Sequence, residues 1–123
     1  MNNLFNKLVK EFMPEKHNFK LYKKSNIIIK NEVWQEIEGY NYLISNYGRV
    51  KNKTSGIIKS LRCSKYGYQI NLWKNGQGKM FTISRLVANY FIREVMIDEK
   101  VIHIDRDIRN NYYRNLKIVK IKV

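Results

Sequence analysis

The segment VIHIDRDIRNNYYRNL, at residues 101–116, contains the one concentrated set of candidate catalytic side chains in the sequence. His103 ends a short apolar run there, and after a polar loop Asn115 and Leu116 open a second apolar run. Two short apolar runs joined by polar residues favour a pair of antiparallel strands. Such a hairpin would place the His103 imidazole and the Asn115 amide on adjacent strands that face one groove, and we expect the candidate site there.

A second informative stretch, YLISNYGRVK at residues 42–51, lies upstream. Its centre predicts a turn in which Gly48 adopts a positive φ, because glycine has no Cβ to clash in that conformation. The turn would set Arg49 and Lys51 at the start of the next strand. We therefore expect Arg49 to contact a phosphate group of a ligand.

Periodicity predicts further elements along the chain. Apolar residues at helical spacing favour an amphipathic helix over residues 3–12, and a strand is expected at 27–29. Alternation over residues 57–81 predicts an antiparallel meander with a turn at Asn75-Gly76, followed by a helix capped by Thr82. The predicted fold is α+β: a small antiparallel sheet, then a helix and a β-hairpin, with an N-terminal amphipathic helix.

The length of 123 residues suits one compact domain with appendages. Composition divides the chain into an N-terminal helix and Lys-rich arm (1–31), a basic β module (32–81) and a final segment (82–123). The apolar face of the N-terminal helix would either cover the core or dock on a partner. The Lys-rich part of the arm, with its interspersed aromatics, would either follow a phosphate backbone or form a solvated linker.

The formal net charge is +14, which predicts attraction to polyanions, nucleic acid first among them. A solvated basic surface without a ligand is the alternative. The sequence indicates a set of candidate cations near turns and strand ends. They are Arg49, Lys51, Arg62, Lys65, Lys74, Lys79, Arg85, Arg109 and Arg114.

Other classes of protein fit the composition poorly. The single cysteine, Cys63, excludes an internal disulfide, and with only two histidines a Cys/His zinc site is not expected. The apolar runs are too short for a membrane span, and the N-terminus lacks a secretory signal pattern. We expect a protein of the bacterial or phage-infected cytoplasm with no membrane partner.

The stretch from residue 34 to 50 resembles the NUMOD4 module found ahead of HNH domains in phage homing-type endonucleases. The resemblance rests on a Trp, a Gly-Tyr pair and the pattern Ile-Ser-Asn-x-Gly-Arg-Val. The matching residues are Trp34, Gly39, Tyr40, Ile44, Ser45, Asn46, Gly48, Arg49 and Val50. Trp34 and Tyr40 are expected in the core rather than stacked on bases.

The stretch at residues 101–116 resembles the HNH motif itself, with His103 on the general-base histidine and Asn115-Leu116 on the second-strand Asn-Leu. Three departures stand out. Ile102 occupies the position of a metal-binding Asn or Asp, Arg106-Asp107 replaces a Gly-Asn turn, and Ile118 replaces a Trp. The sequence ends at Val123, so the HNH-like segment is expected to lack its final helix.

Phosphodiester hydrolysis at such a site needs a base and a divalent cation. The resemblance implies His103 as base, with Asn115 orienting its loop. Mg²⁺ or Mn²⁺ would need oxygen ligands, for which Asp105 and Asp107 are the candidates. Asp105 also fits a role as a turn-capping residue. Without such a site, no cofactor is expected.

Three functions follow from these expectations. The first is a catalytically inactive protein derived from an HNH endonuclease, binding DNA or RNA through a basic groove. The second is a metal-dependent HNH endonuclease that nicks DNA with His103 as general base. The third is a phage-encoded inhibitor that binds a host ribonucleoprotein, such as an RNA-guided (CRISPR) defence complex, through the N-terminal arm.

Overall fold

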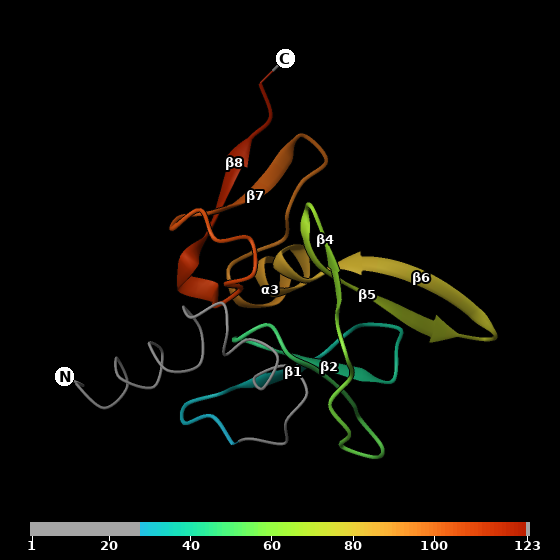
Figure 1. Ribbon diagram of the computed structural model, residues 1–123. Coiled ribbons are helices and arrows are strands. Elements are labelled where there is room, and N and C mark those ends of the chain that lie inside the picture. Colours follow the sequence, from blue (N-terminus) through green and yellow to red (C-terminus); the bar gives the residue numbers. More distant parts are fainter. Residues whose placement is uncertain (1–27, 123) are drawn as a thin grey trace.

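A computed structural model describes residues 28–122, and the expected helix at 3–12 lies outside them. Within this range the chain is α+β, as predicted, with three small antiparallel sheets around one α-helix (Figure 1). No helix in the described range is long and apolar enough to cross a membrane.

The first sheet has the strand order β1-β2-β3 and contains the predicted turn. Its strands are β1 (Trp34–Glu36), β2 (Tyr42–Ser45) and β3 (Val50–Asn52). Gly48 has φ +88°, which confirms the expected positive φ. A Cβ at this glycine would lie 2.8 Å from the Cβ of Asn111, so the turn packs directly against the C-terminal loop.

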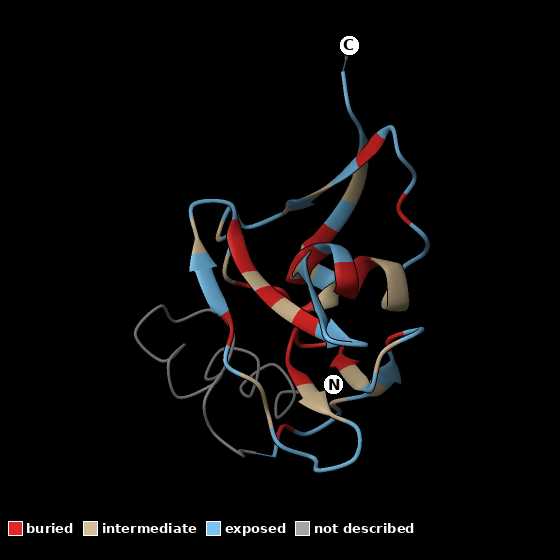
Figure 2. Ribbon diagram, turned by 90° about the vertical axis from the view of Figure 1, so that its right-hand side faces the viewer, coloured by how far each residue is buried: buried red, intermediate tan, exposed pale blue. Residues whose placement is uncertain are grey.

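The second sheet is the predicted meander, with the order β4-β5-β6. Its strands are β4 (Arg62–Ser64), β5 (Gly67–Lys74) and β6 (Gln77–Thr82). Burial alternates along β5, where Ile70 and Leu72 are buried and Gln69 and Asn71 are half-buried (Figure 2). The tip has φ +52° at Asn75 and +76° at Gly76, and two positive φ values favour the tight turn expected from Asn-Gly.

The helix α3 (Ile83–Phe91) follows β6 without a loop and contacts strands of all three sheets. Thr82 stands at the N-cap position, but its side chain makes no capping hydrogen bond, so that part of the prediction was wrong. The reason lies in the continuity of the chain: Thr82 is also the last residue of β6, paired with Gln69. Strand and helix therefore meet at one residue.

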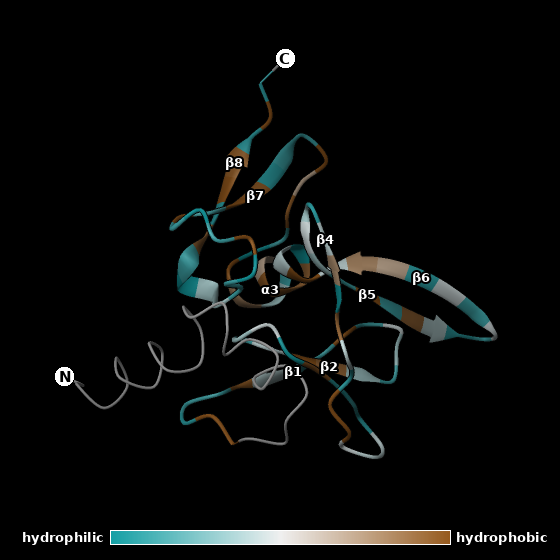
Figure 3. Cartoon of the chain, viewed as in Figure 1, coloured by the Kyte–Doolittle hydropathy of each residue, from teal (hydrophilic) through white to brown (hydrophobic). Residues whose placement is uncertain are grey.

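The third sheet is the hairpin expected from residues 101–116. It pairs β7 (Glu99–His103) with β8 (Leu116–Lys120), and His103 lies opposite Leu116. A mainly hydrophilic loop joins the two strands (Figure 3). Asn115 is not on β8 as expected but in the short 3-10 helix η2 (Tyr113–Asn115) that leads into it.

One hydrophobic core lies under α3 and draws residues from both the 32–81 and the 82–123 segments. Ile44, Leu72 and Ile83 are fully buried in it, and burial of such a side chain contributes about 1.5–3 kcal/mol. The strand expected at 27–29 is not formed by its described residues. Ile28 is 92% exposed while Ile29 is buried, because the chain here turns toward Glu32 instead of joining a sheet.

Candidate nucleic-acid interface

His103 is held at the end of β7 by a buried asparagine. Its Nε2 lies 2.8 Å from Oδ1 of Asn111, a residue that is 2% exposed. An amide oxygen only accepts hydrogen bonds, so Nε2 donates, and in the neutral imidazole the lone pair is then on Nδ1. This arrangement orients the ring and leaves a basic nitrogen.

The loop after His103 is organised around the carboxylate of Asp105. That carboxylate accepts hydrogen bonds from the side-chain amides of Asn110 (2.8 Å) and Asn115 (2.9 Å) and from the backbone N–H of Asp107 (2.8 Å). Partial burial acts to raise the pKa of Asp105, but these hydrogen bonds favour the charged form and lower its pKa overall. Both carboxylate oxygens of Asp105 therefore accept hydrogen bonds that stabilise the loop.

Asn115 completes the same network. Its Oδ1 accepts from the backbone N–H of Asp105 at 3.1 Å, and its Nδ2 also donates to the carbonyl of Asn110 at 2.9 Å. The side chain thus contacts both ends of the loop rather than the His103 ring. The Asn115 side chain therefore holds the loop in position.

The donor groups near His103 do not fit a divalent cation. Asp105 is engaged as described, and Asp107 accepts from the backbone N–H of Arg109 (3.0 Å) with the Arg109 Nε 3.6 Å away. Among residues 28–122, no three His, Cys, Asp or Glu side chains gather as metal ligands. Ile102, at the position where the HNH resemblance expects a ligand, offers no donor atom.

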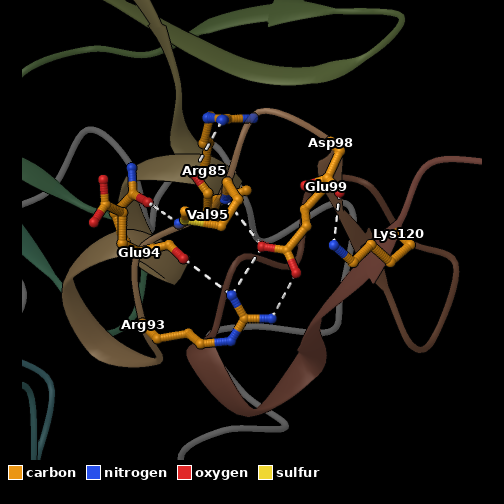
Figure 4. A network of polar contacts seen from close by, with 9 residues as sticks. Arg85, Arg93, Glu94, Val95, Asp98, Glu99 and Lys120 are labelled. Atoms are coloured by element: carbon orange, nitrogen blue, oxygen red, sulfur yellow. Dashed lines mark hydrogen bonds and ion pairs between the residues drawn. The ribbon is translucent and has the colours of Figure 1, made fainter.

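His103 opens on a cleft of about 540 Å³. Among residues 28–122, four cationic residues and no carboxylate line this cleft, which we call the His103 cleft. The cations are Lys65, Arg85, Lys100 and Arg106. Arg85 is held there by a 3.4 Å hydrogen bond to the carbonyl of Val95 (Figure 4).

Two of these cations were missed from the sequence. Lys100 shares an exposed face of β7 with Ile102, and because strand alternation puts that face opposite His103, nothing in the sequence indicated that Lys100 lines the cleft. Arg106 lies in the irregular loop between β7 and β8. The one signal for it in the sequence is that an arginine occupies the position of a glycine in the resembled HNH motif. Lys65 and Arg85 were expected, and the fold brings them together from the β4–β5 turn and from α3.

Arg49 does not lie on this surface. It is 3% exposed, its Nε donates to Glu32 at 2.9 Å, and its guanidinium forms an ion pair with the same carboxylate. A buried and paired guanidinium stabilises the turn, and the expected contact of Arg49 with a phosphate stays a prediction. Lys51 lies beside it, with Nζ 4.1 Å from the ring centroid of the half-buried Trp34.

The remaining expected cations are spread over other surfaces. Arg62 is exposed on β4, while the ammonium groups of Lys74 and Lys79 lie 4.9 Å and 5.3 Å from aromatic ring centroids on the β5–β6 side. Arg109 pairs with Asp107, and Arg114 donates to the Tyr113 hydroxyl at 3.1 Å. None of them lines the His103 cleft.

The start of β7 is fixed by ion pairs (Figure 4). Arg93 donates to both oxygens of the Glu99 carboxylate, at 2.8 and 2.9 Å, and the backbone N–H of Met96 donates to it as well. These bonds, with Arg93 the larger cause, lower the pKa of Glu99 to about 2. Lys120 of β8 pairs with Asp98 at 2.6 Å, which ties the far end of the hairpin.

Comparison with known proteins confirms the resemblance seen in the sequence. Residues 32–71 match the NUMOD4 motif. The chain is 38% identical over 93 residues to the DNA endonuclease I-HmuI of Bacillus phage SP01, covering 73% of this chain and 53% of that protein. It is also 38% identical over 77 residues to an uncharacterized HNH endonuclease of Acanthamoeba polyphaga mimivirus, covering 63% of this chain and 23% of that one.

A solved structure agrees with this relationship. It describes DNA binding and cleavage by the HNH homing endonuclease I-HmuI, and it matches with a TM-score of 0.66 and 36% identity, over 72% of this chain and 52% of that one. The chain thus spans about half the length of I-HmuI. The chain carries a NUMOD4 motif and, over most of its length, is a homologue of the HNH homing endonuclease I-HmuI.

Proposed function

We propose that the chain binds double-stranded DNA on the surface around His103 and does not cleave it. The observation that carries this proposal is the His103 cleft, which in the described part of the chain is lined by four cationic residues and no carboxylate, in a protein of net charge +14. A concave surface that carries only positive charge focuses the electrostatic potential and raises the local concentration of polyanions. The homologue I-HmuI binds and cleaves DNA, which favours DNA over RNA as the ligand of this chain.

Binding would rest mainly on contacts with phosphate groups. Each phosphate neutralised by Lys or Arg releases condensed counterions, so affinity falls steeply as salt rises. The cations come from three separate parts of the fold: Lys65 from a turn, Arg85 from α3, and Lys100 and Arg106 from the hairpin. Such contacts fix the position of a duplex without reading its sequence.

The absence of cleavage is supported by the use of the acidic groups beside His103. Oxygen donors are what Mg²⁺ and Mn²⁺ prefer, but both oxygens of Asp105 accept hydrogen bonds that hold the loop. A cation at Asp105 would therefore compete with these hydrogen bonds for the carboxylate. Ile102 supplies an apolar side chain where a ligand would be needed.

The test is incubation of the purified full chain with a labelled DNA duplex in Mg²⁺, in Mn²⁺ and in chelator, with retention and nicking scored on one gel. We expect retention in all three conditions, falling with salt, and no nicking. A matching RNA duplex serves as control, and tighter retention of RNA would overturn the choice of DNA.

The second candidate function is the endonuclease, and the His103 geometry favours it. The hydrogen bond to Asn111 leaves Nδ1 as a proton acceptor, as a general base requires. If the chain nicks DNA, His103→Ala should abolish metal-dependent nicking and leave retention nearly intact. Nicking lost with His103→Ala would replace the first proposal by this one.

A further inference from the structure

Arg106 has a backbone conformation that is unusual for its residue type. Its φ is +65°, in the left-handed region. Within residues 28–122, the other non-glycine residues with positive φ are Asn31 and Asn75. Asparagine adopts this conformation at little cost, whereas arginine has no short polar side chain to offset the clash of its Cβ. The surrounding structure must therefore impose the conformation.

The loop provides that constraint. The backbone N–H of Arg106 donates to the carbonyl of His103 at 3.0 Å. On either side, the Asp105 carboxylate accepts from Asp107 and Asn115. The arginine is thus carried on a turn that several hydrogen bonds hold in place, three residues from the histidine.

The positive charge of Arg106 has no carboxylate partner within the described part of the chain. The residue is exposed, and no carboxylate of residues 28–122 forms an ion pair with it. Its neighbour Arg109, by contrast, lies against Asp107. Arg106 lines both the His103 cleft and an adjoining cavity of about 430 Å³, so it lies where the two meet.

We propose that Arg106 binds one backbone phosphate of DNA at the His103 cleft, beside the contacts made there by Lys65, Arg85 and Lys100, and that this binding requires no divalent cation. A guanidinium offers several donors in a fixed fork that matches phosphate oxygens. Because these charges belong to side chains, chelation would not remove them. The inference rests on the proposed function and names the group that the cleft binds.

The experiment measures the dissociation constant for a labelled DNA duplex in chelator over a series of salt concentrations. Arg106→Gly and Arg106→Asn both remove the charge and both suit a left-handed residue, so the turn is kept. Lys122→Gln is the matched control, because it removes one positive charge at an exposed residue outside the cleft. Thermal unfolding of each variant reports the fold.

We expect both Arg106 variants to bind about tenfold more weakly than the wild type. The slope of log affinity against log salt should decrease by about one, as for one lost phosphate contact. Arg106→Gly should keep or raise the melting temperature, and Lys122→Gln should change affinity by less than about twofold.

One result would overturn the inference alone: affinity of the Arg106 variants equal to that of Lys122→Gln, because the protein would still bind DNA in chelator and the proposed function would stand. Wild-type binding that chelator abolishes would overturn the inference and also the metal-independent retention expected under the proposed function. A wild-type protein that does not bind duplex DNA in any condition would overturn both.

Discussion

The turn at residues 45–50 and the loop at residues 104–111 make an instructive pair, because each joins two antiparallel strands and each contains an arginine. In the turn, glycine takes the positive φ and Arg49 is buried against Glu32. In the loop, Arg106 itself takes the positive φ and lies exposed at a cleft. The comparison shows that the presence of an acidic partner, more than the motif, decides whether an arginine is available to a ligand.

The largest effect is expected from breaking the buried pair. Arg49→Met should lower the free energy of unfolding by about 3–5 kcal/mol, because it leaves the Glu32 carboxylate buried without a counter-charge. Urea denaturation measures this loss, and adding Glu32→Gln should restore part of it. A variant that keeps its stability and loses only DNA affinity would return Arg49 to the role of a phosphate contact.

The next effect concerns the contact between turn and loop. Gly48→Ala should cost about 2–4 kcal/mol, because the new Cβ combines a strained φ with a 2.8 Å approach to Asn111. Gly76→Ala is the matched control, since φ is +76° there but no atom lies within 4 Å. It should cost only about 1–2 kcal/mol. Equal losses in the two variants would show that Asn111 moves aside without cost.

A smaller effect is expected from the centre of the loop. Asp105→Ala should lower the free energy of unfolding by about 1–2 kcal/mol, because three donors lose their acceptor. Hydrogen exchange of residues 104–111 should become faster at the same time. Asp107→Ala, which removes the acceptor of one backbone N–H, should do less. Unchanged exchange in Asp105→Ala would reopen a role for Asp105 as a metal ligand.

The smallest effect is a dependence on pH that arises at the start of the β7–β8 hairpin. The folded-state pKa of Glu99 lies below its ordinary value, at about 2, so its ion pair with Arg93 stabilises the fold above the ordinary glutamate range. That stabilisation should be lost as pH falls from about 4.5 toward 2. Denaturation of Glu99→Gln over this range should show a weaker pH dependence, and an equal slope in both proteins would argue against the pair.

Local patterns predicted the local structure well. Gly48 and Asn75-Gly76 fixed two turns through their backbone preferences, alternation located β5, and two apolar runs around a polar loop located the β7–β8 hairpin. The strand expected at 27–29 was wrong because three consecutive isoleucines do not say which neighbour they pair with.

The candidate site was harder to predict, because it depends on distant partners. Glu32 lies 17 residues before Arg49, and no spacing rule links the two. The His103 cleft similarly joins a turn, a helix and a hairpin, so the sequence suggested Lys65 and Arg85 but not that they meet Lys100 and Arg106. Motif matching gave the residue types, and tertiary packing decided which of them face a ligand.

The close approach of Gly48 to Asn111 limits which segments of related proteins can be joined in one chimeric chain. Tyr113 N–H also donates to the Asn46 carbonyl at 3.0 Å, so the NUMOD4 turn and the hairpin loop meet backbone to backbone. A chimera that joins residues 28–81 to the hairpin of a related protein would have to reproduce these contacts. The NUMOD4 segment can be exchanged only together with the loop residues that it contacts.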